Sequence, residues 1–343
     1  MKRRGVNYDV GIETSGFRSR PVFEIEVVRR ELAIIKHDLK CNAVRISGTD
    51  PDRLMAAAEI ALNQGLEVWL SPHLHDQEED ETLRYTVQCA NRAEELRRRY
   101  SGLVFILGCE LTLFMQGIFE GDTIFDRVSS PGFMESIRTG EHNMRLQAFL
   151  TKAIREVRER FRGEITYASA PLETVDWSLL DYIGLDHYRD IRNHDSYASK
   201  LTSYARWQKP VIVTEFGCCT YQGAEDAGGR GWMIVDRTSP ARKRLNAEYI
   251  RDEVLQAKEL VEQLTVLDAA GVEGAFVFTF AAPTMVHDRE PLHDLDMASY
   301  ALVKSLADGR GVRFPDMRWE PKQSFDAVAR YYAERELSQD SRK

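Results

Sequence analysis

Short apolar segments alternate with longer helical segments along most of this 343-residue chain, and this order of elements constrains the fold more than any other feature. The first helical segment, residues 24–38, has apolar side chains at helical spacing and lies between the strand-like segments 5–8 and 42–47. The next helix has clear boundaries, because Asp50 is a favourable N-cap and Gly65 stands just past its end. A repeated order of strand, helix and strand predicts parallel pairing within one sheet.

The same alternation continues to about residue 280 without a break that would mark a second domain. Further helices are expected at residues 51–64, 80–100, 143–161 and 244–270. Strands are expected at residues 5–8, 42–47, 66–70, 103–107, 164–168, 182–185, 210–214 and 274–280. Eight short strands separated by helices favour an α/β fold with a single (β/α)8 barrel, the TIM-barrel architecture. We expect one domain over residues 1–343, with a C-terminal helical extension from about residue 297.

Three longer loops follow the fourth, seventh and eighth strands, near residues 111–142, 218–243 and 281–296. The loops at the C-terminal ends of barrel strands carry function, so these three should wall the site. The alternative fold is an open doubly wound sheet, but residues 9–13 lack the Gly-rich turn of its nucleotide site. Residues 228–231 are Gly-rich yet match no phosphate loop, and we expect them to form a flexible loop.

Composition and charge exclude several classes of partner. The net charge is −8 with both signs mixed along the chain, so no basic surface for nucleic acid is expected. No apolar stretch approaches the roughly 20 residues needed to cross a bilayer, and no apolar signal segment follows the N-terminus. The five cysteines are an odd number without metal-ligand spacing, and the adjacent Cys218 and Cys219 are poorly placed to bridge each other. We therefore expect free thiols, no membrane contact and a cytoplasmic location.

Two glutamates end apolar strand segments and are the first candidates for chemistry. Glu110 and Glu215 lie 105 residues apart, which equals about three strand-plus-helix units and places them on the fourth and seventh strands. A single carboxyl group there could equally cap a helix or form an ion pair, so the hypothesis depends on the pairing. The full set of polar residues expected at the strand ends is Arg45, His73, His75, Glu110, His187, Tyr188 and Glu215.

This set resembles the large clan of barrel-fold retaining glycoside hydrolases, over roughly residues 5–285. The resemblance implies that Glu110 is the acid/base at the end of strand four and that Glu215 is the nucleophile at the end of strand seven. Its most specific part is Val213–Gly217, which reads Val-Thr-Glu-Phe-Gly. Also similar to the clan are Arg45 on strand two, a His after strand three and a Tyr after strand six.

The chain departs from the clan in two places. Cys109 stands where the clan usually has an Asn that binds the sugar 2-hydroxyl, which weakens that contact. The eighth strand commonly ends in a Trp platform, whereas this chain offers only Phe, and Phe280 would stack less extensively. Residues 296–304 also resemble a segment of uncharacterised bacterial proteins labelled as abortive infection proteins, a label that explains no residue chemistry.

The chemistry needs two carboxyl groups in different protonation states. Glycoside cleavage passes through an oxocarbenium-like state that requires a nucleophile on one face and a proton for the leaving oxygen. Arg45 beside Glu215 would keep the nucleophile ionised, and Tyr188 could donate a hydrogen bond to the same carboxylate. Glu110 must then have the higher pKa. No cofactor is required, and the expected partner is a carbohydrate substrate held in a pocket that accepts a small glycoside or oligosaccharide.

Several other residues are candidates for substrate binding. His73 and His75 alternate in an extended segment and so share one face, where we expect one to contact sugar while the other packs. Trp232 is either a lid or a sugar-stacking residue. Weaker candidates are Asn7, Asp9, Asp186 and His187, with Asp186 satisfied by Arg45 inside the barrel as the alternative and His187 satisfied under the sixth loop. Phe114, Phe119 and Phe125 are expected to form one packed cluster.

Two other classes of function remain open. A metal-dependent hydrolase could use His73 and His75, and a sugar isomerase could use Glu110 as a ligand. Strand five ends in Ala168-Ser169-Ala170, which offers no further ligand and counts against both. The acidic loops around His287 and His293 are expected to be solvated, so we expect no metal site there. A catalytically silent carbohydrate-binding barrel is the third class, and Cys109 is the best argument for it.

Overall fold

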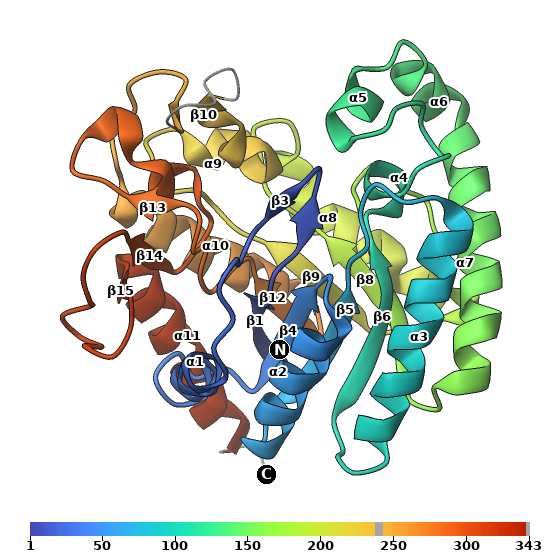
Figure 1. The fold of residues 1–343 in the computed structure, drawn as a ribbon, viewed down its shortest axis with the longest axis horizontal. Helices are drawn as coiled ribbons and strands as arrows, with labels where there is room; N and C mark the ends of the chain where they lie inside the picture. The colour runs from blue at the N-terminus through green and yellow to red at the C-terminus, as the bar shows by residue number, and fades with distance from the viewer. Residues whose placement is uncertain (237–242, 341–343) are drawn as a thin grey trace.

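Eight parallel strands close into one barrel in the computed structural model, which describes residues 1–236 and 243–340 (Figure 1). In order around the barrel they are β1 (Arg3–Asp9), β4 (Ala43–Gly48), β5 (Glu67–Pro72), β6 (Leu103–Cys109), β7 (Glu164–Ser169), β8 (Ile183–Asp186), β9 (Val211–Phe216) and β12 (Gly274–Val277). β12 pairs back onto β1, with Gly5 opposite Phe276. The predicted (β/α)8 barrel is confirmed.

Helices surround the strands and hold the predicted order. They are α1 (Ile25–His37), α2 (Pro51–Asn63), α3 (Glu79–Arg97), α7 (Glu141–Arg160), α8 (Tyr197–Thr202), α10 (Glu253–Ala269) and α11 (Gln323–Asp340). α2 begins as expected, because the Asp50 side chain accepts hydrogen bonds from the backbone N–H groups of Asp52 and Arg53. α10 begins later than predicted, since Asp252 caps it and the preceding β11 (Arg244–Leu245) pairs with β10 (Val235–Asp236).

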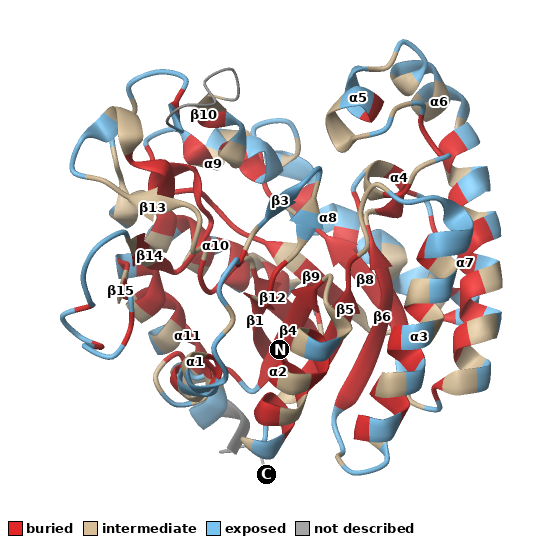
Figure 2. Cartoon of the chain, in the orientation of Figure 1, coloured by how far each residue is buried: buried red, intermediate tan, exposed pale blue. Residues whose placement is uncertain are grey.

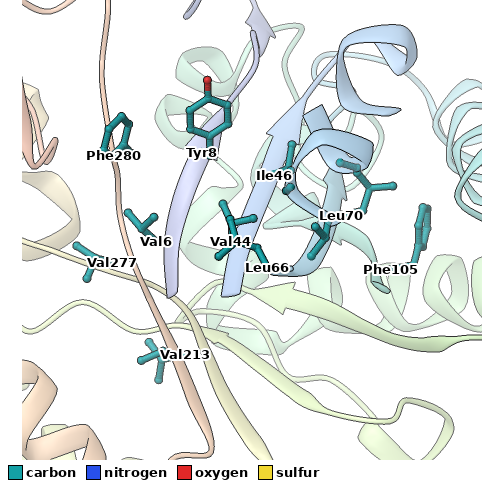
Figure 3. Close-up of a cluster of buried hydrophobic side chains, with 14 of the residues drawn as sticks. Val6, Tyr8, Val44, Ile46, Leu66, Leu70, Phe105, Val213, Val277 and Phe280 are labelled. Atoms are coloured by element: carbon teal, nitrogen blue, oxygen red, sulfur yellow. The ribbon is translucent and has the colours of Figure 1, made fainter. Parts of the chain in front are cut away.

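Side chains alternate between the inside of the barrel and the layer beneath the helices. Val6 and Tyr8 of β1 belong to the large core that also contains Val44 and Ile46 of β4 (Figure 3). A separate apolar layer fills the barrel and consists of Ala43, Trp69, Val104, Ile106, Cys109, Ala168, Tyr182, Ile212 and Phe276. Strand residues are almost all buried, and exposure is concentrated on the outer helix faces and loops (Figure 2).

The C-terminal helix differs from the expected extension. Tyr332 of α11 donates a hydrogen bond to the Gly5 carbonyl of β1 (2.9 Å), and Tyr331 donates to the Leu264 carbonyl of α10 (3.1 Å). α11 therefore lies beside α10 and is the helix that follows the eighth strand of the barrel (Figure 1). It is preceded by a small sheet of β13 (Val286–His287), β14 (Val303–Leu306) and β15 (Trp319–Pro321), so the segment from 297 is not wholly helical.

The longer loops gather at the C-terminal ends of the strands, as predicted (Figure 1). The loop after β6 contains α4 (Leu111–Phe114), α5 (Ile124–Ser129) and α6 (Phe133–Thr139). The loop after β9 contains α9 (Ala224–Ala227) and the 3₁₀ helix η4 (Gly228–Ile234). A hairpin of β2 (Glu13–Thr14) and β3 (Phe17–Arg18) follows β1.

The five cysteines are buried free thiols, as predicted from their number and spacing. Among the described residues, no helix combines the length and the apolar character that crossing a membrane requires.

Candidate active site

Glu215 on β9 receives short hydrogen bonds from Arg45 on β4 and from Tyr188, which follows β8, and a longer one from Cys109. Arg45 Nη1 lies 2.6 Å from Glu215 Oε1, and the Tyr188 hydroxyl donates to Oε2 at 2.9 Å. A hydrogen bond between two charged groups is roughly twice as strong as a neutral one, so Arg45 is the stronger of these two partners of the carboxylate. The Glu215 side chain is 13% exposed, so it is in contact with solvent while it is held.

Arg45 is wholly buried on β4 and is oriented by its neighbours. Besides Glu215, its Nη1 donates to the Asn7 side chain on β1 (3.1 Å), and its Nη2 donates to Ser71 Oγ on β5 (3.1 Å). Asn7 in turn donates to the Thr214 carbonyl (3.0 Å), next to Glu215 in the chain. Contacts with β1, β5 and β9 therefore orient the Arg45 guanidinium toward the Glu215 carboxylate.

Asp186 ends β8 directly beside this pair. Thr214 Oγ1 donates to its Oδ1 (2.7 Å) and Cys109 Sγ to its Oδ2 (3.2 Å), whereas Arg45 is 4.0 Å away. Burial, reinforced by the negative charge of Glu215, raises the pKa of Asp186 to about 8. The raised pKa favours the protonated form of Asp186, and protonation lessens its competition with Glu215 for the charge of Arg45. The predicted pairing of Asp186 with Arg45 is present as a long ion pair, and Thr214 and Cys109 add the hydrogen bonds.

Glu110 follows β6 in a left-handed backbone conformation, with φ of 47°. Burial raises its pKa well above the ordinary value, and the nearby charges of Asp186 and Glu215 raise it further. A non-glycine residue in this conformation costs about 1–3 kcal/mol, so its surroundings must hold it there. The Glu110 N–H bonds to the Ala168 carbonyl of β7 (2.9 Å).

Two residues that sequence reasoning missed brace the turn at Glu110. The Leu111 N–H donates to the Tyr167 hydroxyl (2.7 Å), and the Thr112 hydroxyl donates to Glu173 (2.7 Å). Tyr167 itself donates to Glu173 (2.9 Å), which closes the network. Glu173 lies in the short loop after β7, the fifth strand of the barrel. The sequence around Glu173 did not indicate this role, because its partner Thr112 is 61 residues away in the chain.

The two strands that carry the carboxyl groups both have irregular pairing at these positions. The register between β6 and β7 shifts between Ile106 and Cys109, and that between β8 and β9 shifts before Asp186 pairs with Glu215. Such bulges redirect a side chain relative to a regular strand. Both groups lie at the same end of the barrel because their strands are parallel.

His73 and His75 lie on one face, as their spacing predicts, and continue the network outward. Ser71 Oγ is 3.1 Å from His73 Nε2, and His73 Nδ1 is 3.2 Å from His75 Nε2. His75 Nδ1 reaches Thr14 Oγ1 of the β2–β3 hairpin (2.6 Å). Burial lowers the pKa of both rings, that of His75 to about 3, so both are neutral near pH 7. The chain of contacts therefore couples Arg45 to the loop above the barrel without adding charge.

Two predicted binding residues do not reach this site. Phe280 is fully buried and packs between Tyr8 and Trp319, within the core layer of Figure 3. The prediction was wrong because β12 ends at Val277, three residues before the expected end. The half-buried Phe278 lies against Tyr188 instead, with ring centroids 6.4 Å apart.

His187 is the second residue that does not reach the site, because it lies on the helix side of β8. Its ring stacks on Tyr197 of α8 at a centroid distance of 4.2 Å, and Nε2 lies 2.9 Å from the Tyr197 carbonyl. The alternative reading, a satisfied polar residue under the sixth loop, describes it correctly.

The aromatic residues of the loop after β6 do not form the single cluster that was predicted. Phe114 stacks on His75 with centroids 4.0 Å apart, while Phe119 packs on Phe133 at 4.6 Å. Phe125 instead meets Trp232 of η4 edge-on at 6.1 Å. Trp232 therefore joins the loop after β9 to the loop after β6.

A metal fits this donor set poorly. Within the described part of the chain, Cys109, Asp186 and Glu215 bring three potential ligand atoms within 4.8 Å of one another. Glu215 is already bonded to Arg45, and burial raises the pKa of the Cys109 thiol well above its usual range, so the thiolate a metal requires is disfavoured. In the acidic loop after β12, Asp294 contacts both His287 (3.0 Å) and Arg251 (3.1 Å) and is thus held by protein groups.

Comparison with known proteins places the fold. No protein-family model and no curated protein sequence matches the chain. Among solved structures, a GH113 β-1,4-mannanase aligns with a TM-score of 0.62 at 16% identity, over 97% of this chain and 99% of that one. The GH113 β-mannanase AaManA from Alicyclobacillus acidocaldarius gives 0.59 at 16% identity, over 97% of each chain. The endo-β-1,4-mannanase from Thermotoga petrophila gives 0.53 at 10%, over 97% of this chain and 76% of that one. At such identities the likeness shows the fold, and this chain has the barrel fold of these glycoside hydrolases.

Proposed function

We propose that the protein is a retaining glycoside hydrolase in which Glu215 is the nucleophile and Glu110 is the acid/base. The proposal is carried by one observation, the contrast between the two carboxyl groups. Glu215 accepts hydrogen bonds from Arg45 and Tyr188, which favour its charged form, while burial and neighbouring charge raise the pKa of Glu110. Double displacement needs this division between an ionised and a protonated carboxyl group.

In the first step a Glu215 oxygen forms a bond to the anomeric carbon as the glycosidic bond breaks. Glu110 gives its proton to the leaving oxygen, and a glycosyl-enzyme remains. In the second step Glu110, now ionised, removes a proton from water, whose oxygen attacks the anomeric carbon and releases Glu215. Arg45 supports the charge of Glu215 before the first step and again when the second step releases the carboxylate, and a protonated Asp186 does not compete for it.

The substrate is a carbohydrate, and contacts between loops favour a small glycoside or an oligosaccharide bound by its end. Phe125 and Trp232 join the loops after β6 and β9, and Lys243 Nζ lies 4.1 Å from the ring centre of Phe17 in the first hairpin. The same hairpin also contacts the loop after β5, because the Ser15 N–H donates to Asp76 (3.0 Å). Such links narrow the approach to the strand ends and disfavour a long polymer lying across them. The free, buried thiols favour a reducing, cytoplasmic setting.

The test is hydrolysis of a broad panel of aryl glycosides by the wild-type protein, Glu215→Ala and Glu110→Ala, with and without azide. Both substitutions should abolish turnover of substrates with poor leaving groups. Azide should rescue Glu215→Ala with a glycosyl azide of inverted configuration and Glu110→Ala with one of retained configuration. A chelator should have no effect. Turnover that survives both substitutions would contradict the two-carboxylate mechanism, and loss with chelator would favour a metal-dependent hydrolase.

A non-catalytic carbohydrate-binding barrel is the second candidate, and the environment of Cys109 favours it. The thiol is directed at Asp186 (3.2 Å) and lies 3.7 Å from Glu215, and it offers none of the amide donors of an Asn. If sugars bind in calorimetry with no turnover of any glycoside, and binding persists in Glu215→Gln, this candidate replaces the hydrolase.

A further inference from the structure

Tyr188 donates a hydrogen bond to Glu215, and the residues that pack against the Tyr188 ring lie outside the barrel. Its ring belongs to a second apolar cluster, formed by the loops after β9 and β12 and separate from the main core. Within this cluster the ring meets Tyr300 edge-on, with centroids 5.5 Å apart, and meets Phe278 at 6.4 Å. The position of the Tyr188 hydroxyl therefore depends on how these two loops pack.

The Gly-rich segment predicted to be a flexible loop forms part of that support. It begins η4, and the backbone of Gly229 lies so close to the Tyr188 ring that an added Cβ would stand 3.3 Å from it. A Cβ at Gly228 would collide with the Arg189 carbonyl at 2.6 Å, and one at Gly231 would collide with Cys219 Sγ at 2.8 Å. The glycines therefore permit close packing behind Tyr188.

The hydroxyl of Tyr300 fastens both ends of this segment. It donates to the Gly228 carbonyl (2.6 Å) and accepts from the Gly231 N–H (2.9 Å), so it bridges the turn on either side of Gly229. The Tyr300 side chain is buried, and the same residue supplies the ring that packs against Tyr188. Tyr300 lies in the 296–304 segment, to which the site described so far assigns no role.

We propose that Tyr300 is a positioning residue for Glu215: it clamps the glycine turn behind Tyr188 and thereby fixes the hydroxyl that donates to the carboxylate. Tyr300 touches neither Glu215 nor a reacting atom in this arrangement, so its effect must pass through Tyr188. The role of Glu215 as nucleophile rests on the proposed function, but the mechanical link between Tyr300 and the carboxylate does not.

Tyr221 provides a matched control in the same cluster. It is equally buried, and its hydroxyl also donates to the glycine segment, at the Gly231 carbonyl (3.2 Å). Its ring packs on Tyr249, with centroids 5.1 Å apart, rather than on Tyr188. Substitution of either tyrosine should therefore loosen the packing of the cluster in general. Only substitution of Tyr300 should change the position of Tyr188.

The experiment is a double-mutant cycle on the full-length protein with Tyr188→Phe, Tyr300→Phe, their combination and Tyr221→Phe. Each protein is labelled with glutamate carrying ¹³C in the side-chain carboxyl, and the Glu215 resonance is identified by its absence in Glu215→Gln. This resonance reports the surroundings of the carboxylate whether or not the protein hydrolyses any substrate. The pH profile of kcat/KM on the best aryl glycoside is measured in parallel.

We expect Tyr300→Phe to move the Glu215 resonance in the same direction as Tyr188→Phe and to lower kcat about tenfold with little change in KM. In the Tyr188→Phe background it should add nothing to either readout, because the two act in series. Tyr221→Phe should lower the melting temperature yet leave both readouts unchanged.

The proposal is overturned if Tyr300→Phe leaves the resonance in place, or moves it equally when the Tyr188 hydroxyl is absent. An equal effect of Tyr221→Phe would also overturn it, since the effect would then be one of general packing. Absence of turnover in the wild-type protein would instead count against the proposed function, and the resonances would still decide the role of Tyr300.

Discussion

A buried arginine lies inside the barrel at each end. The acids around one arginine are partly solvated, whereas those around the other are largely shielded from water. At the N-terminal end, Arg3 of β1 donates to Glu67 and Glu273 and to the Tyr182 hydroxyl (3.0 Å). The two carboxylates are 26% and 33% exposed, so water shares in their solvation. At the C-terminal end, Arg45 is wholly buried and faces Glu215, with Asp186 and Glu110 nearby.

The difference separates a structural charge cluster around Arg3 from the charge cluster around Arg45 at the candidate active site. Water can stabilise the excess negative charge around Arg3, and the layer containing Trp69 seals that end of the barrel. Around Arg45 one cation faces three acidic groups in poorly hydrated surroundings, so the excess is relieved by protonation. This is why the pKa is raised for Asp186 and Glu110, and it leaves a proton available at the end that faces the loops.

The strongest test of this contrast replaces each arginine by methionine. Arg45→Met should lower kcat/KM at least about 100-fold, because Glu215, the proposed nucleophile, loses its charged donor. Arg3→Met should lower the free energy of unfolding by about 2–4 kcal/mol, less than for a fully buried pair since its partners are partly solvated, and should leave kcat per folded molecule unchanged. Aryl glycoside kinetics and urea unfolding measure the two effects. If Arg3→Met also lowered kcat, the two ends would not be independent.

The protonation of Asp186 should be visible as a pH dependence of stability. Its pKa is raised from an ordinary value of 3.8 to about 8, so between these values the folded state holds a proton that the unfolded state has lost. Stability is therefore highest below pH 4 for this group and falls as the pH rises toward 8, by at most about 1.4 kcal/mol per pH unit. Urea unfolding of Asp186→Asn should show a flatter dependence between pH 5 and 8. Parallel curves for the two proteins would show that Asp186 is ionised throughout.

The loop contacts lie above the Arg45 end of the barrel, and their removal should change the preference for substrate length. Phe125→Ala and Trp232→Ala should each raise kcat/KM for longer oligosaccharides relative to a short aryl glycoside, by up to about tenfold, because the contact between the rings is lost. The double variant should add little beyond either single one. Phe17→Ala is the control for the hairpin contact and should act less, since Phe17 is 44% exposed. An unchanged ratio in all variants would mean that these loops do not limit substrate length.

The smallest expected effect concerns the hydrogen bond between His75 and Thr14, at the loop end of the contacts that run through His73 and His75. Thr14→Val removes the hairpin's hydrogen bond to His75, worth about 0.5–1.5 kcal/mol, so amide exchange in the hairpin should become about 2- to 10-fold faster. Thr151→Val is a control, because the Thr151 hydroxyl donates within α7, to the Gln147 carbonyl (2.8 Å). Exchange measured by mass spectrometry after Thr14→Val should change in the hairpin alone. Faster exchange across β1 as well would show that the hairpin is part of the core.

The sequence predicted the regular parts of the fold because local signals specify them. The N-cap at Asp50, the apolar spacing of α1 and the short apolar strands follow from neighbouring residues, and all appear as expected. Errors arose where a distant contact decides the conformation. A long loop separates β12 from the helix that follows it, α11, and the chain leaves strand geometry after Val277.

Sequence alone thus determined a (β/α)8 barrel and named the two glutamates, because hydrophobic period and strand-end position are local properties of the chain. The tertiary structure decided which groups share Arg45, since the register shifts at β6 and β9 bring Cys109, Asp186 and Glu215 together from three strands. It also decided that Tyr167 and Glu173 brace Glu110 and that Tyr300 lies behind Tyr188. These are contacts between residues far apart in the chain, and the pKa of a buried acid depends on the charges and water around it in space rather than on its neighbours in sequence.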